Sequence, residues 1–207
     1  GCARSRSSDL MGPPVEYHSD GVTTSGLTFE FNPKVDILFV VDNSGSMKEE
    51  QAKLQQAADL FVDSFGANSF IDYHVGIITV SDSSRCGSLD KKGELVKCYP
   101  VGKLQPLKGG VSATPFVTRS ANAKDILRAS LNVGTLSLAE GGPEFEEMFS
   151  PVLKAIEPSM NKENGGFIRE GSRLVIIMVS DEDDSSTSVS EDSFIFHLDQ
   201  QIGAGNY

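Results

Sequence analysis

A group of hydroxyl and carboxylate side chains occupies one short turn of the sequence. Asp42, Ser44 and Ser46 stand at alternating positions of the segment Asp-Asn-Ser-Gly-Ser, between an apolar run and a helical pattern. Three oxygen side chains at this spacing can point at one centre, and such hard ligands suit Mg²⁺, Mn²⁺ or Ca²⁺ better than zinc. Ser and Asp are also the commonest N-cap residues, so a plain helix cap is the alternative interpretation.

A second acidic turn follows a later apolar run. Asp181 comes directly after residues 174–180, and three further acids follow it in the segment 181–184. A carboxylate at this position can supply a further oxygen ligand if the two turns meet. A charge run of this kind is also typical of a solvated loop, and that interpretation stays open.

The pattern of apolar residues predicts the elements that position these turns. Nearly continuous apolar runs are typical of strands buried on both faces, and amphipathic runs between them predict helices. Alternating strands and helices favour an α/β fold with a Rossmann-like, doubly wound, mostly parallel sheet, whose ligands lie beyond the carboxyl ends of the strands. The predicted strands are 27–31 (at an edge), 35–41, 73–80 and 174–180, and the predicted helices follow residue 47 and cover 123–131, 144–156 and 191–202.

The turn at residues 41–47 resembles a motif of a known family. Val-Asp-Asn-Ser-Gly-Ser-Met is similar to the DxSxS motif of von Willebrand factor A (VWA) domains, which bind a divalent cation at a metal-ion-dependent adhesion site. The resemblance spans roughly residues 35–205 and includes an Asp after the fourth strand, here Asp181. It implies that Ser44 and Ser46 ligate the metal directly, that Asp42 and Asp181 act directly or through water, and that a partner's carboxylate completes the coordination.

The chain departs from the family in the loop that usually supplies a threonine. Residues 134–144 read Gly-Thr-Leu-Ser-Leu-Ala-Glu-Gly-Gly-Pro-Glu, and the Gly pair is followed by Pro143, which has no ligating side chain. Either Thr135 approaches the metal from a shifted loop, or Glu144 or Glu140 replaces the threonine. An acid would make the site more negative, so that it holds cations more tightly and attracts a partner's carboxylate less.

The three cysteines indicate an envelope location. The start Gly1-Cys2 followed by a polar tract resembles the cleavage site of a bacterial lipoprotein, in which the Cys carries the lipid; an arbitrary cut is the alternative. Cys86 and Cys98 can close one disulfide, worth roughly 2–3 kcal/mol for a short loop, in an oxidising compartment. Zinc would need four ligands, and no further Cys or His lies nearby.

The predicted organisation is a tether at residues 1–26 and a VWA-like domain at 27–207 with a disulfide-bearing insertion at 81–119. Few residues follow Asp181, so the domain is expected to be cut short at its C-terminal end. The net charge of −11 and pI of about 4.7 argue against nucleic-acid binding. No run of about 18 apolar residues, which a membrane-spanning helix needs, is present.

These features predict a lipid-anchored module on the periplasmic or outer side of the bacterial cell envelope. It would bind a protein or surface ligand through a divalent cation, Mg²⁺ before Mn²⁺ or Ca²⁺, in adhesion or complex assembly, and would not be an enzyme. The first alternative is an envelope scaffold in which the cation is purely structural. The second is a metal-assisted hydrolase, for which the sequence offers no well-placed general base.

Overall fold

The structure is a computed structural model, and it divides the chain into two units, residues 1–32 and 33–207. Cys2, Cys86 and Cys98 lie outside the described residues, and so do the predictions of lipidation and of a disulfide. The described residues are 16–18, 21–24, 27–29, 33–66, 70–85, 88–89, 92–93, 101–110 and 113–207, with the backbone alone for residues 16–29 and 65–66.

The first unit contains a small antiparallel sheet. Strand β1 (Glu16–His18) pairs with β2 (Gly21–Thr24), and β2 pairs with β3 (Leu27–Phe29). The predicted boundary after residue 26 falls between β2 and β3, and the second unit begins at Pro33.

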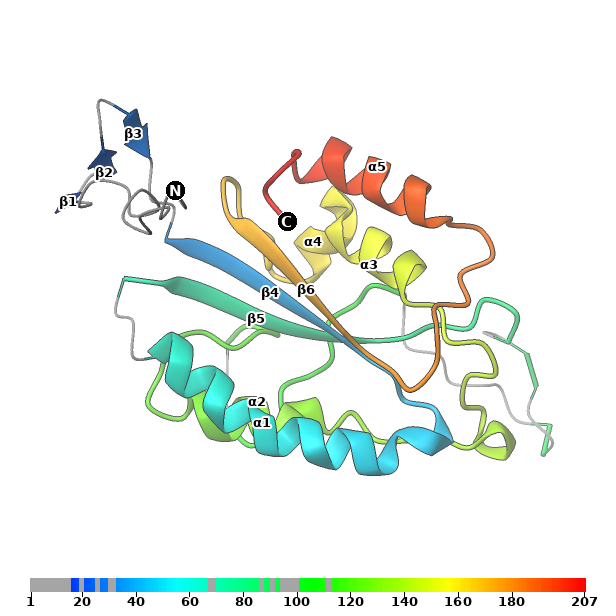
Figure 1. The fold of residues 1–207 in the computed structure, drawn as a ribbon. Helices are drawn as coiled ribbons and strands as arrows, with labels where there is room; N and C mark the ends of the chain where they lie inside the picture. Colours follow the sequence, from blue (N-terminus) through cyan, green and yellow to red (C-terminus); the bar gives the residue numbers. More distant parts are fainter. Residues whose placement is uncertain are drawn as a thin grey trace, which may run out of the picture. The chain divides into compact units, whose positions relative to one another are not determined.

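The second unit is built on a parallel sheet of three strands. They are β4 (Lys34–Val41), β5 (Asp72–Thr79) and β6 (Arg173–Val179), in the order β5-β4-β6, so that β4 lies in the centre (Figure 1). Val41, the last residue of β4, is in register with Thr79 and with Val179. All three strands therefore end at the same edge, and the α/β fold with a parallel sheet is confirmed.

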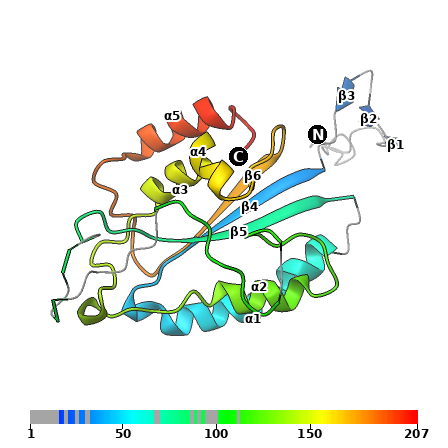
Figure 2. The same cartoon turned by 180° about the vertical axis from the view of Figure 1, so that it is seen from behind.

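Helices cover both faces of this sheet, as Figures 1 and 2 show. Ile37, Phe39 and Val41 belong to the core on the side of α1 and α2, and Leu38 and Val40 belong to the core under α3 and α5. The alternation follows from the period of two along a strand. None of the helices in the described part of the chain is long and apolar enough to cross a membrane. The helices are α1 (Lys48–Gly66), α2 (Ala123–Leu131), α3 (Phe149–Ile156), α4 (Pro158–Glu163) and α5 (Glu191–Gln201).

The predicted insertion at residues 81–119 contributes to the core of the second unit. Val117 exchanges two backbone hydrogen bonds with Val75 of β5 (2.8 and 2.9 Å), and the N–H of Gln105 donates to the Ile77 carbonyl at 2.7 Å. Phe116 is buried as well. These contacts cover the outer edge of β5, which would otherwise present unpaired backbone groups.

The helix predicted at residues 144–156 is shorter than expected, because α3 begins only at Phe149. The Asp184 carboxylate accepts the backbone N–H groups of Met148 (2.6 Å) and Phe149 (3.1 Å) and so satisfies the free donors at this helix start. The amphipathic pattern predicted the apolar face correctly and the start of the helix wrongly. Residues 144–148 form a loop that leads to the carboxyl edge of the sheet.

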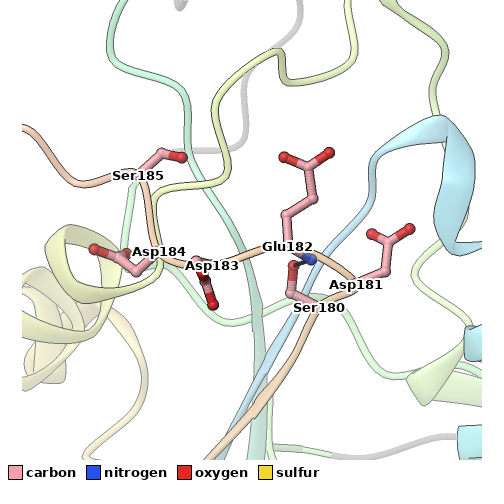
Figure 3. A pocket seen from close by; sticks show the side chains of 6 residues that line it. All are labelled: Ser180, Asp181, Glu182, Asp183, Asp184 and Ser185. Carbon is pink, nitrogen blue, oxygen red and sulfur yellow. Dashed lines mark hydrogen bonds between the residues drawn. The ribbon is translucent and has the colours of Figure 1, made fainter.

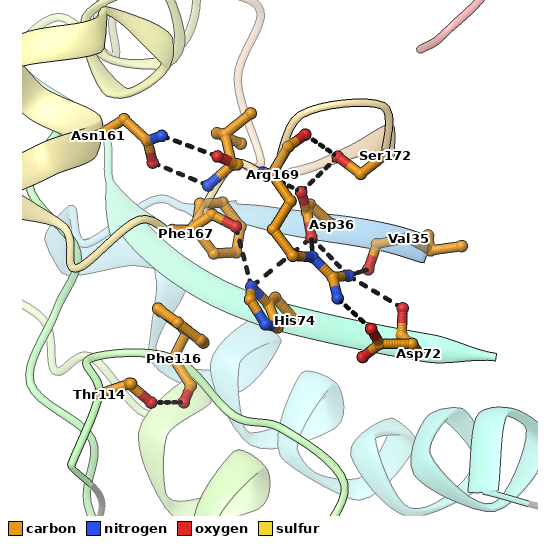
Figure 4. A network of polar contacts seen from close by, with 11 residues as sticks. Val35, Asp36, Asp72, His74, Thr114, Phe116, Asn161, Phe167, Arg169 and Ser172 are labelled. Carbon is orange, nitrogen blue, oxygen red and sulfur yellow. Dashed lines mark hydrogen bonds and ion pairs between the residues drawn. The ribbon is translucent and has the colours of Figure 1, made fainter. Parts of the chain in front are cut away.

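A buried ion pair holds the opposite edge of the sheet (Figure 4). Asp36 of β4 is fully buried and accepts hydrogen bonds from the Arg169 backbone N–H (2.7 Å), its Nε (2.8 Å) and the Ser172 hydroxyl. Arg169 also donates to the Asp72 carboxylate at 2.6 Å. The loop before β6 is thereby tied to the first residues of β4 and β5, so the buried Asp36 has a structural partner.

Candidate metal centre

The turn after β4 brings Asp42, Ser44 and Ser46 together. Asp42 is fully buried, and its Oδ1 accepts the Ser44 backbone N–H at 2.7 Å. The two serine hydroxyls lie 3.0 Å apart. Ser44 precedes the short 3-10 turn η2 (Gly45–Met47), but its hydroxyl makes no capping hydrogen bond to that turn. The helix-cap interpretation of Ser44 is therefore not supported, because the hydroxyl lies against Ser46 instead.

The turn after β6 meets the turn after β4. The two strands are neighbours in the sheet, and the Asp42 N–H donates to the Val179 carbonyl at 2.9 Å. The Ser180 hydroxyl donates to Asp42 Oδ2 at 2.8 Å, and the Ser46 hydroxyl donates to Asp181 Oδ1 at 3.3 Å. Asp42, Ser44, Ser46 and Asp181 are thus linked by hydrogen bonds at one edge of the sheet.

The acidic turn lines an open hollow (Figure 3). The hydroxyl of Ser180 accepts the backbone N–H of Glu182 at 3.0 Å, which shapes this turn. Asp181 and Glu182 extend to the same side in Figure 3, whereas Asp184 points elsewhere and caps α3. The four consecutive acids therefore have different roles, and the solvated-loop interpretation does not describe Asp184.

The acids proposed to replace the family's threonine, Glu140 and Glu144, are both exposed. Glu140 is exposed, and its carboxylate accepts the backbone N–H (3.0 Å) and the hydroxyl (2.6 Å) of Ser137, which hold the pKa of Glu140 below its usual range. Glu144 is also exposed, and its backbone N–H donates to Asp82 at 2.9 Å. In the described residues no hydrogen bond connects either side chain to Asp42.

Thr135 lies beside helix α1. It lines a hollow with Lys48, Gln51 and other residues of α1 and of the preceding loop. Within the described ranges it forms no hydrogen bond with Ser44 or Ser46.

Glu146 is a residue of the candidate centre that sequence reasoning missed. Its side chain is 4% exposed, and its Oε2 atom has no hydrogen-bond partner. Burial, followed by repulsion from the carboxylates of Asp42 and Glu182, raises the pKa of Glu146 from 4.5 to about 7. The backbone of Glu146 lies against the turn after β6, because its carbonyl accepts the Ser185 N–H at 3.0 Å. The signal in the sequence is two adjacent charges, Glu146 and Glu147, within an otherwise apolar stretch.

The centre carries negative charge that no basic side chain of the described residues offsets with an ion pair. In the described part of the chain, Asp42, Glu146, Asp181 and Glu182 form no ion pair with a lysine or an arginine. Burial raises the pKa of Asp42, against the opposing effect of hydrogen bonds from Ser44 and Ser180, and the charge of Asp181 raises it further. Buried carboxylates of this kind are normally paired or coordinate a metal.

The donors at this edge are oxygen atoms of two chemical kinds. No set of three His, Cys, Asp or Glu side chains in the described residues is arranged closely enough to hold a metal ion by itself. The candidate centre instead combines the hydroxyls of Ser44 and Ser46 with carboxylates. Such hard oxygen donors fit Mg²⁺, Mn²⁺ or Ca²⁺ and offer no soft ligand for zinc or copper.

Gln51 of α1 joins the loops on either side of the centre. The side chain is 2% exposed, and its Nε2 donates to the carbonyls of Asp42 (2.8 Å) and Gly134 (3.1 Å). Its Oε1 accepts the Gly134 N–H at 3.2 Å. One amide side chain therefore satisfies three backbone groups and sets where the turn after β4 lies.

Comparison with known proteins adds no assignment to this geometry, because no protein-family model and no curated protein sequence matches the chain.

Proposed function

We propose that this chain is a binding module, similar to VWA domains, that uses a divalent cation at the carboxyl edge of its sheet to bind a protein or surface ligand. Mg²⁺ is the first candidate cation, and Mn²⁺ and Ca²⁺ are the others. The role is adhesion or complex assembly and not catalysis. We also propose that the domain has the doubly wound, Rossmann-like sheet of that family.

The observation that carries the proposal is the buried carboxylate charge that has no cationic partner among the described residues, next to the paired hydroxyls of Ser44 and Ser46. Asp42 is fully buried and Glu146 nearly so, and the described residues offer them no cationic partner. A divalent cation would remove the repulsion between their carboxylates, which costs free energy in a medium of low dielectric constant. Hydrogen bonds link Ser44, Ser46 and Asp181 to Asp42, so the edge supplies several oxygen atoms for a hard cation.

Glu146 takes the role that the family gives to a threonine. The hydroxyls of Ser44 and Ser46 would bind the cation directly, and Asp42 and Asp181 directly or through water. Glu146 would add a third carboxylate, and a carboxylate of the partner would then complete the coordination. Thr135, Glu140 and Glu144 stay as alternatives for the third loop. Thr135 lies next to the turn after β4, because the N–H of the following residue, Leu136, donates to the Asn43 carbonyl at 2.9 Å.

The proposed location is the bacterial cell envelope, with a lipid on Cys2 and a disulfide between Cys86 and Cys98. This part rests on the sequence alone. The intact mass of the protein, expressed with a lipoprotein leader, would reveal the added acyl chains. Alkylation of free thiols before and after reduction would show whether two cysteines are held in a disulfide.

Titration calorimetry with Mg²⁺, Mn²⁺ and Ca²⁺ tests the cation centre. The double variant Ser44→Ala/Ser46→Ala should lose at least roughly tenfold in affinity, because it removes two proposed ligands. Ser64→Ala is the matched control, since Ser64 is an exposed serine near the other end of α1. Equal cation affinity in the double variant and the control would reject the proposal.

A second candidate function is an envelope scaffold with a purely structural cation. It is favoured by the burial of Glu146 beside Asp42, because three carboxylates of the chain leave fewer open positions for a partner. Partner capture with and without chelator separates the two functions. Capture that persists in chelator, together with a lower melting temperature, identifies the scaffold.

A further inference from the structure

The first turns of α1 and the loop that follows α2 line a hollow of about 350 Å³. The two helices lie side by side on one face of the sheet (Figures 1 and 2). A hollow of this volume is at the lower end of the range for small-molecule sites. Its lining residues are Lys48, Gln51, Ala52 and Gln55 of α1 and Asn132, Gly134 and Thr135 of the loop.

Two glutamines of the lining are held by hydrogen bonds to the backbone. The Gln51 amide bonds to the backbone of Asp42 and of Gly134, and the Gln55 Nε2 donates to the Arg128 carbonyl at 3.0 Å. Side chains that are already fixed lose little conformational freedom when a ligand binds. This part of the lining is therefore ordered before any ligand arrives.

Three polar groups of the lining have no hydrogen-bond or ion-pair partner within the part of the chain that the structure describes. They are the Lys48 ammonium, the Gln55 Oε1 atom and the Asn132 side-chain amide. Together they offer a cation, an acceptor and an amide that both donates and accepts. Ala52 is the only apolar side chain among the lining residues. A matching ligand is therefore polar, with one negative group for the lysine and hydroxyl groups for the amides.

The charges near the hollow favour a ligand with a single negative charge. No carboxylate is among the lining residues, and Glu50, on the next positions of α1, pairs with Lys53 at 3.4 Å. The hollow therefore offers one ammonium group, that of Lys48. The chain as a whole carries a net charge of −11, which repels each further negative charge on a ligand. A carboxylate fits this balance better than a phosphate ester, which carries up to about two charges at neutral pH.

We propose that this hollow binds a small hydroxylated carboxylic acid of the size of a sugar acid. Lys48 takes the carboxylate, and the amides of Gln55 and Asn132 take the hydroxyl groups. The charge of Lys48 selects the acid over neutral sugars, and the net charge of the chain selects it over sugar phosphates. This site uses none of the proposed cation ligands Asp42, Ser44, Ser46, Glu146 and Asp181, so it does not depend on the proposed function.

Titration calorimetry on the full chain, stripped of metal ions on a chelating resin, tests this site without a cation that could bind the acid itself. The probes are D-glucuronate and D-gluconate, with D-glucose as the neutral comparison and D-glucose 6-phosphate as the doubly charged one. Both acids should bind. Lys48→Gln should weaken their binding by roughly tenfold or more, because it removes a charge-assisted hydrogen bond. Lys53→Gln is the matched control, since the Lys53 side chain is 72% exposed on α1 and does not line the hollow.

Two further measurements place the bound acid and separate this site from the cation centre. Amide NMR shifts on adding glucuronate should be largest at residues 48–55 and 132–135, and Ser44→Ala/Ser46→Ala should bind the acids as the wild type does. The proposal is overturned if neither acid binds, if Lys48→Gln binds them as Lys53→Gln does, or if glucose or glucose 6-phosphate binds as tightly. A wild type that binds the acids but no divalent cation would reject the proposed function and support this site.

Discussion

Glu146→Gln should stabilise the metal-free protein and weaken cation binding at the same time. Glu146 is buried, its Oε2 has no hydrogen-bond partner among the described residues, and the charges of Asp42 and Glu182 raise its pKa further. Glutamine has nearly the same shape without the charge, so it removes the repulsion when no metal is bound. A residue that served only to stabilise the fold would show the opposite sign.

The pKa of Glu146 sets the size of this effect. Folding raises the pKa from 4.5 to about 7, so the folded state binds the proton more tightly than the unfolded state does. The stability that comes from the neutral carboxyl is fully present below about pH 4.5 and is lost as the pH rises through about pH 7. The loss amounts to about 3 kcal/mol above neutral pH and to a few tenths of a kcal/mol near pH 4.5.

Denaturant unfolding in chelator, at about pH 8 and at pH 4.5, measures this difference in the free energy of unfolding. We expect Glu146→Gln to be more stable than the wild type at the higher pH by up to about 3 kcal/mol, and nearly equal to it at the lower pH. Glu163→Gln is the matched control, because Glu163 is an exposed acid at the end of α4 and has no proposed role in the centre. Added Mg²⁺ should raise the wild type's stability more than the variant's. A variant less stable than the wild type at about pH 8 in chelator would refute the reasoning.

Three further predictions follow from contacts in the second unit. Arg169→Ala should lower the free energy of unfolding by up to about 3–5 kcal/mol, because it removes the guanidinium group that pairs with the fully buried Asp36; urea unfolding measures this. Gln51→Leu should lower the free energy of unfolding by about 1–3 kcal/mol for each backbone group of Asp42 and Gly134 that loses its hydrogen bond. Calorimetry should also show weaker cation binding, because the Gln51 side chain no longer holds the turn after β4 in place. Mg²⁺ at a hundredfold excess over its Kd should raise the free energy of unfolding by about 2.7 kcal/mol relative to chelator, and the melting temperature should rise with it. An unchanged melting temperature would count against the centre.

Much of the fold could be predicted because its signals are local. The central strand β4 is an unbroken apolar run, and its buried residues divide between the two faces as the period of two requires. The start of α3 could not be predicted, because the apolar pattern continues through residues 144–148. The carboxylate of Asp184, far along the chain, caps the helix at Phe149.

The candidate centre shows the same division. Asp42, Ser44 and Ser46 lie two residues apart and contact one another within a single turn, so their spacing alone predicts the group. Asp181 joins them across 135 residues only because β6 lies next to β4 in the sheet. The resemblance to VWA domains predicted that Asp181 would approach the turn of Asp42. The contact itself depends on β6 lying next to β4 in the sheet.

The sequence by itself therefore determined the apolar strands, the amphipathic helices and the turn of Asp42, because each depends on residues that are close in the chain. Only the tertiary structure decided which acid of the loop before α3 is buried and which is exposed. Asp82 holds the N–H groups of Glu144 and Phe145, so the loop turns the Glu144 side chain to solvent while Glu146 is buried beside Asp42. The burial of a side chain depends on the path of its backbone, and distant carboxylates set that path here.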